Sequence, residues 1–187
     1  LTTVGIVIGV SSVVLMSTAL KGIDTAFEEG ISSLGSDVLY IDKWEWFSNT
    51  EWWTIRRRKN IKLSDYDKFT DMVKKPLAHE PTLWSIETIK TGDRVVESIF
   101  VTGTNQDYIK TTNYAFSEGR FFTEIESKSS RYVVVIGSEI AENLFPRESA
   151  SEKYIKIGGF EFKVVGVLEK QGSYMLGAHN PDKQVFV

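Results

Sequence analysis

The sequence contains no cysteine and only two histidines among its 187 residues. The absence of cysteine excludes disulfide bonds, thiol nucleophiles and the thiolate ligands of structural zinc sites. Positive charge is not in excess either, since 22 lysines and arginines face 25 acidic residues, and this balance argues against a nucleic-acid partner. Neither a glycine-rich phosphate loop nor an HExxH, CxxC, GxSxG or EF-hand pattern occurs, so no motif for nucleotide binding, hydrolysis or calcium binding is present.

Few residues are left that could carry catalysis or bind a metal. His79 stands beside Glu80, and one imidazole with one carboxylate makes at most half of a metal site. His179 lies in a polar stretch and is expected to be solvated. Ser138 follows Gly137, but the nucleophile elbow is incomplete, so a helix N-cap is the favoured role for Ser138. We predict no catalytic, metal or cofactor site in this chain, and a membrane-tethered enzyme is the least favoured hypothesis.

Charge is missing altogether from residues 1–20, and Lys21 is the first ionisable side chain. About 20 apolar residues are needed to cross the hydrocarbon core of a bilayer. We therefore predict a transmembrane helix over residues 1–22. A secretory signal peptide is the alternative, but no basic n-region precedes the run and the helical pattern continues beyond it.

The apolar positions continue at helical spacing after the predicted span, through Ile23, Phe27, Ile31 and Leu34. This spacing predicts that a stalk helix over residues 23–35 continues the membrane helix as one rod, in spite of two glycines that each cost about 1 kcal/mol in a helix. Gly35 suits the C-terminal cap, and residues 36–41 then have the pattern of a first strand.

The remaining residues alternate between helical and strand patterns, which predicts an α+β domain. After the first strand we expect a long loop over residues 44–60 and then a helix that is capped by Ser64, has Asp67 at its third position and is ended by Pro76. Two hairpins are expected, one of residues 83–90 and 95–103 and one of residues 154–157 and 160–164 around two glycines. Between and after them we expect a short helix at residues 105–110, a turn at residues 118–120, a strand at residues 131–136, a helix at residues 139–145, a loop over residues 171–183 and a last strand from residue 184.

Tryptophan and arginine concentrate in the predicted long loop. The residues concerned are Trp44, Trp46, Trp52, Trp53, Arg56, Arg57, Arg58 and Lys59. A tryptophan cluster can form an apolar surface for a ligand, a partner protein or the membrane headgroup region, although packing inside the domain is an equal alternative. The basic run can contact anionic lipid headgroups or can remain a solvated loop. We keep these tryptophans and arginines as candidate substrate or partner contacts.

Four stretches of the sequence resemble conserved blocks of the MacB-type ABC transporter permeases of the FtsX-like superfamily. They are residues 1–13 (LTTVGIVIGVSSV), residues 31–39 (ISSLGSDVL), residues 134–145 (VVIGSEIAENLF) and residues 155–168 (IKIGGFEFKVVGVL). Each stretch alone is generic, but the four occur in the family's order and spacing. The tryptophan-rich loop and the basic run fall outside the pattern.

The resemblance implies the first membrane helix and the periplasmic core domain of such a permease. That domain has two lobes, a mixed α/β porter lobe, expected here at residues 36–112 and 178–187, and a small strand-rich sabre lobe, expected at residues 113–177. The implied location is the inner (cytoplasmic) membrane, with the soluble domain on the periplasmic side.

The resemblance also implies a function, which is mechanotransmission that couples cytoplasmic ATP hydrolysis to substrate export. The implied partners are a nucleotide-binding domain or subunit that holds the ATP and Mg, a second permease copy, a periplasmic adaptor protein and the lipid membrane. The alternative within the superfamily is a regulatory domain that controls a cell-wall hydrolase or senses antimicrobial peptides.

Overall fold

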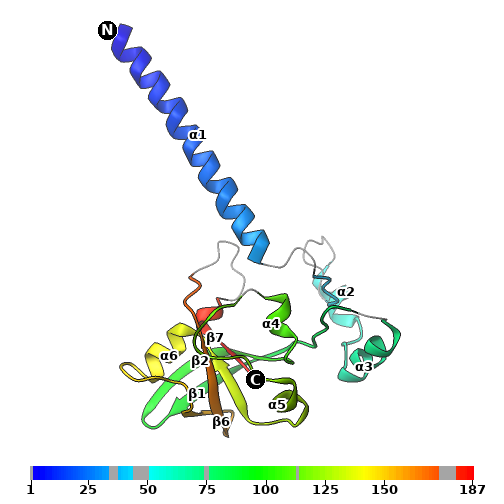
Figure 1. Cartoon of the computed structure of the whole chain (residues 1–187). Coiled ribbons are helices and arrows are strands. Elements are labelled where there is room, and N and C mark those ends of the chain that lie inside the picture. Colours follow the sequence, from blue (N-terminus) through cyan, green and yellow to red (C-terminus); the bar gives the residue numbers. More distant parts are fainter. Residues whose placement is uncertain (1, 34–37, 44–50, 74–75, 113, 173–179) are drawn as a thin grey trace.

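The structure is a computed structural model that describes residues 2–33, 38–43, 51–73, 76–112, 114–172 and 180–187. Its first element, α1 (Thr2–Ser33), is one uninterrupted helix that projects from the rest of the molecule (Figure 1). Within α1, residues Thr3–Thr25 are long and apolar enough to cross a membrane, and none of the most apolar window is buried. The predicted rod is therefore confirmed as far as Ser33, while Gly35 lies outside the described residues.

The segment between α1 and the sheet differs from the prediction in three respects. Residues 38–41, the described part of the expected first strand, do not form a strand. The expected long loop contains a short helix, α2 (Trp52–Arg57). The next helix, α3 (Leu63–Met72), begins one residue before the predicted cap, so Lys62 is the N-cap and its backbone N–H donates to the Asp65 carboxylate at 3.1 Å. A carboxylate was thus correctly expected in the first turn of α3, but at the wrong position.

Seven strands form one sheet. They are β1 (Leu83–Thr91), β2 (Arg94–Gly103), β3 (Phe116–Gly119), β4 (Val133–Ile136), β5 (Tyr154–Ile157), β6 (Phe160–Leu168) and β7 (Gln184–Phe186). Both predicted hairpins, β1–β2 and β5–β6, are confirmed. Their turns use Gly92, Gly158 and Gly159, all with positive φ, as tight hairpin turns require.

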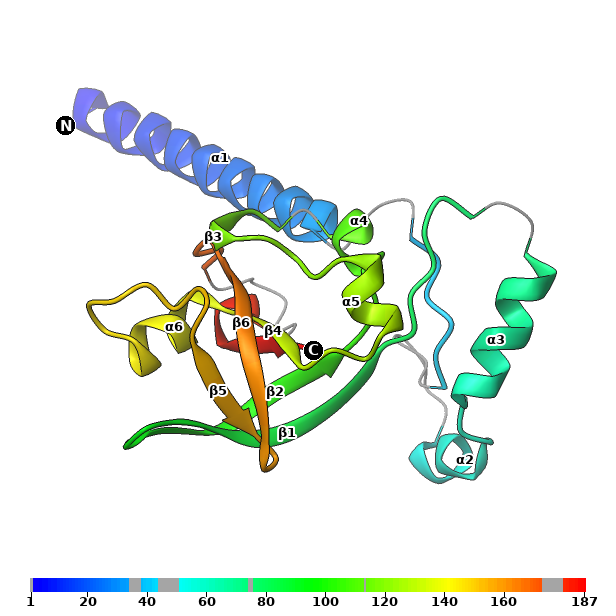
Figure 2. The same cartoon turned by 60° about the horizontal axis from the view of Figure 1, so that its bottom comes forward.

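The sheet closes on itself. Its strand order is β3-β6-β4-β7-β2-β1-β5, and β5 also pairs with β6. Six strands therefore form a ring, and β3 extends β6 outside it; Figure 2 shows the strands curving round. The closing β1–β5 contact is short, with Ile89 opposite Ile157 and Lys90 opposite Lys156. Closure leaves few free strand edges, a common way to protect an all-antiparallel or mixed sheet.

One core fills the interior of this ring. The interior-facing residues alternate along the strands, so that Val134 and Ile136 of β4 point inward, as do Ile155 and Ile157 of β5. Helix α6 (Ser138–Leu144) adds Ile140 and Leu144 to the same cluster. The predicted helix after the strand at residues 131–136 is confirmed, although Gly137 and not Ser138 is its N-cap.

A second core lies on the outer face of β4, β6 and β7. It contains the intervening strand residues Val135, Val165, Leu168 and Phe186, together with Phe121 and Phe122. The segment that covers it carries α4 (Tyr108–Thr111), β3 and α5 (Glu124–Lys128). Every strand that separates the two cores is thus buried on both faces, which explains the unbroken β-branched run of β4.

A close backbone approach fixes the covering segment to β6. A Cβ built on Gly166 would lie 2.2 Å from the carbonyl oxygen of Arg120, and one built on Gly119 would lie 2.2 Å from that of Val165. The two glycines face each other in the β3–β6 pairing. Side chains at these positions would force the strands apart.

Strands from both predicted lobes share this sheet. β1, β2 and β7 come from the expected porter segments and β3 to β6 from the expected sabre segment, and the β4–β7 and β1–β5 pairings join the two sets. The position of a boundary between the lobes stays a prediction. The α+β class and the preceding helix are confirmed.

Candidate functional site

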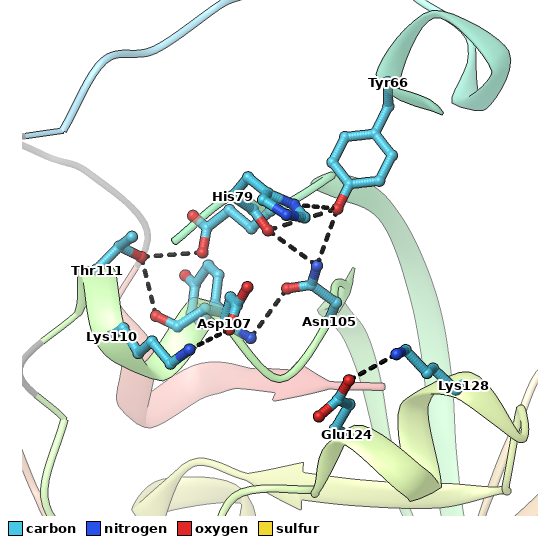
Figure 3. Close-up of polar contacts among 10 residues, drawn as sticks. Tyr66, His79, Asn105, Asp107, Lys110, Thr111, Glu124 and Lys128 are labelled. Carbon is cyan, nitrogen blue, oxygen red and sulfur yellow. Dashed lines mark hydrogen bonds and ion pairs between the residues drawn. The ribbon is translucent and has the colours of Figure 1, made fainter. Parts of the chain in front are cut away.

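A polar junction joins α3 to the sheet. It is built around Tyr66 of α3, His79 in the segment before β1, and Asn105 in the loop after β2 (Figure 3). The Tyr66 hydroxyl lies 2.7 Å from Nδ1 of His79. The Asn105 side-chain amide donates to the Tyr66 oxygen at 3.2 Å and to the His79 carbonyl at 3.0 Å. Three segments that are distant in sequence are therefore held by one set of hydrogen bonds.

The junction continues into α4. The Asn105 side-chain oxygen accepts from the backbone N–H of Asp107 at 3.0 Å, and the buried Asp107 carboxylate pairs with Lys110 at 2.6 Å. The Thr111 hydroxyl donates to Glu80 at 2.9 Å, so the residue after His79 contacts the last turn of α4. His79 and Glu80 thus have different partners, and they do not face a common point where a metal ion would bind.

Burial shifts the acid–base properties of the junction. Loss of solvent raises the pKa of Glu80, an effect that the Thr111 hydrogen bond opposes and the negative charge of Asp107 reinforces. Burial also raises the pKa of Tyr108 far above its ordinary value. The pKa of Tyr40 is raised by burial and, to a smaller extent, by the charge of Glu80. Tyr40, in the segment that follows α1, therefore lies within electrostatic range of the junction.

The junction is a network of polar side chains. It contains a phenol, an imidazole, an amide and carboxylates, which are tied to one another by hydrogen bonds. Among the residues that the structure describes, no group of three or more histidine, cysteine or acidic side chains is placed to hold a metal ion. The junction holds together α3, the segment before β1 and α4.

The predicted tryptophan and arginine contacts lie mainly on α2. Trp44 and Trp46 fall outside the described residues, whereas Trp52, Trp53, Arg56 and Arg57 belong to α2 and Arg58 is its C-cap. Trp53 is 48% exposed, and the three arginines are exposed. The structure therefore places Trp53, Arg56, Arg57 and Arg58 at the surface of one short segment. Their proposed contact with a substrate or partner stays a prediction.

Lys43 attaches α2 to the segment that follows α1. Its ammonium donates to the carbonyl of Arg56 at 3.3 Å and to the side chain of Asn60 at 2.7 Å. In return, the Arg58 guanidinium donates to the carbonyl of Lys43 at 3.3 Å. The position of α2 is thus coupled to residues that come shortly after the stalk.

Asp182 is a buried carboxylate that the sequence analysis did not single out. It is 3% exposed, and its two carboxylate oxygens accept from the backbone N–H groups of Gln171 and Gly172, both at 2.9 Å. Asn180 caps the turn η1 (Pro181–Lys183) by accepting from the Asp182 N–H at 2.9 Å. The Asn-Pro-Asp triplet is a turn signal, which could have indicated this arrangement. Asp182 ties the start of β7 to the end of the β6 segment.

A projecting helix with a stretch apolar enough to cross a membrane, followed later in the chain by a closed α+β sheet, is typical of a membrane-anchored domain. The chain belongs to the family described as MacB-like periplasmic core domain, whose family model matches residues 1–187. This finding confirms the resemblance of the four sequence stretches.

Curated relatives agree with this assignment. The chain is 29% identical over 187 residues to the macrolide export ATP-binding/permease protein MacB of Marinobacter nauticus, covering 100% of this chain and 28% of that protein. It is also 29% identical over 179 residues to the pyoverdine export ATP-binding/permease protein PvdT of Pseudomonas aeruginosa, covering 92% of this chain and 25% of the relative. The chain therefore spans about a quarter of the length of these relatives.

A solved structure has the same fold. The periplasmic region of MacB from Actinobacillus actinomycetemcomitans matches with a TM-score of 0.56 and 21% identity, over 70% of this chain and 56% of that one. At this level of identity the likeness concerns the fold alone.

Proposed function

We propose that this chain is the first membrane helix and extracytoplasmic domain of an ABC export permease, and that it transmits ATP-driven motion from the inner (cytoplasmic) membrane to the outer domain. In this proposal ATP and Mg bind to a separate nucleotide-binding domain or subunit, and two permease copies work together with a periplasmic adaptor. The names of the curated relatives, which describe macrolide and pyoverdine export, support the export role. Because those cargoes differ, the proposal does not extend to a particular cargo.

The observation that carries the proposal is the single helix α1, which contains the candidate span and continues beyond it. This helix is 32 residues long, and in the next described segment the pKa of Tyr40 is raised by burial and by the charge of Glu80, a residue of the polar junction. The helix extends eight residues beyond Thr25, which corresponds to about 12 Å at 1.5 Å per residue. In this proposal α1 acts as one rigid helix and carries a displacement of the span as far as Ser33.

The test is to break the stalk part of α1 in the complete permease. We would replace Asp24 and Glu28 together by proline, because each proline removes a helical hydrogen bond and costs about 3 kcal/mol or more. The matched control carries Asp24→Ala and Glu28→Ala, which remove the same charges and keep the helix. In proteoliposomes containing the nucleotide-binding partner, we expect the proline variant to keep ATP hydrolysis and to lose export, whereas the alanine variant keeps both.

Two outcomes would reject mechanical coupling through α1. One is normal export by the proline variant, and the other is equal loss of export in the proline and alanine variants. A wild-type protein that hydrolyses ATP without exporting any compound, but activates a cell-wall hydrolase, would support the regulatory alternative.

A further inference from the structure

A basic patch with exposed apolar side chains surrounds α2. The patch consists of Arg56, Arg57, Arg58, Lys59 and Lys62 together with Trp53, Ile61 and Leu63. All five basic residues are exposed, and the three apolar side chains are 48%, 53% and 62% exposed. The region therefore presents apolar surface and clustered positive charge at accessible positions.

The charge of this region is opposite to that of the chain. Residues 51–63 contain five basic residues and one acid, Glu51, whereas the whole chain has a net charge of −3. Arg56, Arg57, Lys59 and Lys62 form no ion pair with another residue in the described part of the chain. Their charge is therefore available to an external anionic surface.

The patch is held within reach of the membrane. The candidate span ends at Thr25 and α1 ends at Ser33. Lys43 comes ten positions after Ser33, so a fully extended chain could place Lys43 at most about 35 Å from the end of α1. Lys43 in turn contacts α2 through the carbonyl of Arg56. In Figure 1, α2 lies above α3 and the sheet, toward the end at which α1 joins the domain.

We propose that the basic patch around α2 docks on the anionic phospholipid headgroups of the membrane that α1 spans. Lys and Arg near an anionic surface each contribute about 1 kcal/mol, and a tryptophan with neighbouring aliphatic side chains inserts at the headgroup level. This inference rests on the membrane location of α1 in the proposed function. It adds a second contact with lipid, which would fix the angle between the stalk and the outer domain.

Lipid fits the patch better than an acidic protein partner for two reasons. The bilayer is already tethered to the patch by α1, so its effective concentration is high without any recognition event. The apolar and basic side chains are also interspersed along residues 53–63, which is the pattern of an interfacial segment and differs from the apolar centre with a polar rim found in protein interfaces.

The experiment uses the absence of cysteine in the chain. A cysteine at the exposed position 54 (Thr54→Cys) would carry the only thiol-linked donor dye, and the whole chain would be placed in nanodiscs that contain a headgroup-labelled acceptor lipid. Energy transfer reports how close α2 lies to the bilayer. We expect higher transfer in discs containing phosphatidylglycerol than in phosphatidylcholine discs, and a decrease when salt is raised from about 50 mM to about 500 mM.

The variant Arg56→Gln, Arg57→Gln and Lys59→Gln removes three charges of the patch. Each charge removed should reduce the docking equilibrium constant by about fivefold, so the three together should reduce it by about 100-fold. We therefore expect the energy transfer in the two kinds of disc to become equal. The matched control is Lys90→Gln, Arg131→Gln and Lys156→Gln, three exposed bases outside the patch that form no described ion pair. This control should leave the transfer unchanged.

Transfer that does not depend on phosphatidylglycerol, or that both triple variants reduce equally, would overturn lipid docking. A specific protein partner would then be the explanation of the patch. Because the readout is a distance to lipid, its failure is distinguishable from failure of the proline test, which is read by ATP hydrolysis and export.

Discussion

The barrel and the segment that precedes it are stabilised by different kinds of contact. In residues 83–187, two clusters of fully buried apolar side chains lie on the two faces of the sheet. In residues 38–73, by contrast, Ile55 is the buried hydrophobic residue among those described, and α3 has no buried residue at all. Hydrogen bonds of Tyr66 and Lys43 contribute to holding this preceding segment.

This difference separates a stable body from a part that can move. A helix of ten residues such as α3 is marginal by itself in water, so its stability depends on the junction. Segments with few buried apolar contacts open at lower free energy than a core. We therefore expect the α2–α3 segment to reorient against the barrel without unfolding it, which is the property that a coupling element between a stalk and a rigid domain needs.

Phe186→Ala should have the largest effect, because it removes a buried side chain from the core of the barrel. Phe186 is fully buried, and its ring lies 5.2 Å from that of Tyr108 and 6.0 Å from that of Tyr114. It also belongs to β7, the strand that links β4 and β2. We expect the free energy of unfolding of the whole chain in detergent to fall by about 3 to 5 kcal/mol in urea denaturation.

The control for Phe186 is Val95→Ala, a truncation of an exposed residue on β2, which should change stability by less than about 0.5 kcal/mol. Equal losses in the two variants would show that the second core does not stabilise the barrel.

Tyr66→Phe should have a smaller and local effect. It removes the hydroxyl that contacts His79 and Asn105 and keeps the ring, so about 0.5 to 1.5 kcal/mol should be lost. Because the loss falls on the junction, amide hydrogen exchange should become faster in α3 while β4 and β6 remain protected. Tyr154→Phe, at an exposed position of β5, is the control and should leave both regions unchanged. Faster exchange throughout the barrel would contradict the separation of the two regions.

Local patterns in the sequence were sufficient for the hairpins and for α1. The alternation of apolar and polar residues around Gly158 and Gly159 predicts the register of β5 and β6. The uncharged run of residues 1–20, followed by apolar residues at helical spacing, predicts the single long helix α1. Helix α5 could also have been found, because Thr123 and Glu126 form the capping box that a Thr-x-x-Glu pattern signals. These features depend on residues close in sequence.

Closure of the barrel and the polar junction could not be predicted in this way. The β1–β5 contact involves two residue pairs about 67 residues apart, too few to leave a pattern in either strand. Likewise, Tyr66, His79 and Asn105 are ordinary in their local contexts, and only the fold brings them together. The start of α3 shows a smaller version of the problem, since the predicted cap Ser64 with Asp67 is replaced by Lys62 with Asp65, and helix ends are set less precisely by local sequence than helices themselves.

Glu80→Gln should have the smallest effect on stability. Because this effect depends on pH, it tests whether the polar junction is held by charge or by neutral hydrogen bonds. Burial raises the pKa of Glu80 in the folded chain above its unfolded value of about 4.3, so the folded state takes up the proton first as pH falls. The Glu80 carboxyl therefore lowers stability at neutral pH, and this cost disappears as pH falls through the folded pKa toward the unfolded one. Glutamine keeps an oxygen for the Thr111 hydroxyl and carries no charge.

We expect the glutamine variant to be more stable than the wild type at pH 7, by less than about 1 kcal/mol because the site is only partly buried, and the difference to vanish near pH 4. Urea denaturation at a series of pH values measures it, with Glu97→Gln at an exposed position of β2 as the control. A variant that is less stable than the wild type at pH 7, by a difference that vanishes near pH 4, would mean that the charge of Glu80 stabilises the junction. In that case the α2–α3 segment would be held by electrostatic attraction and not by neutral hydrogen bonds, and its attachment would weaken, not strengthen, on acidification.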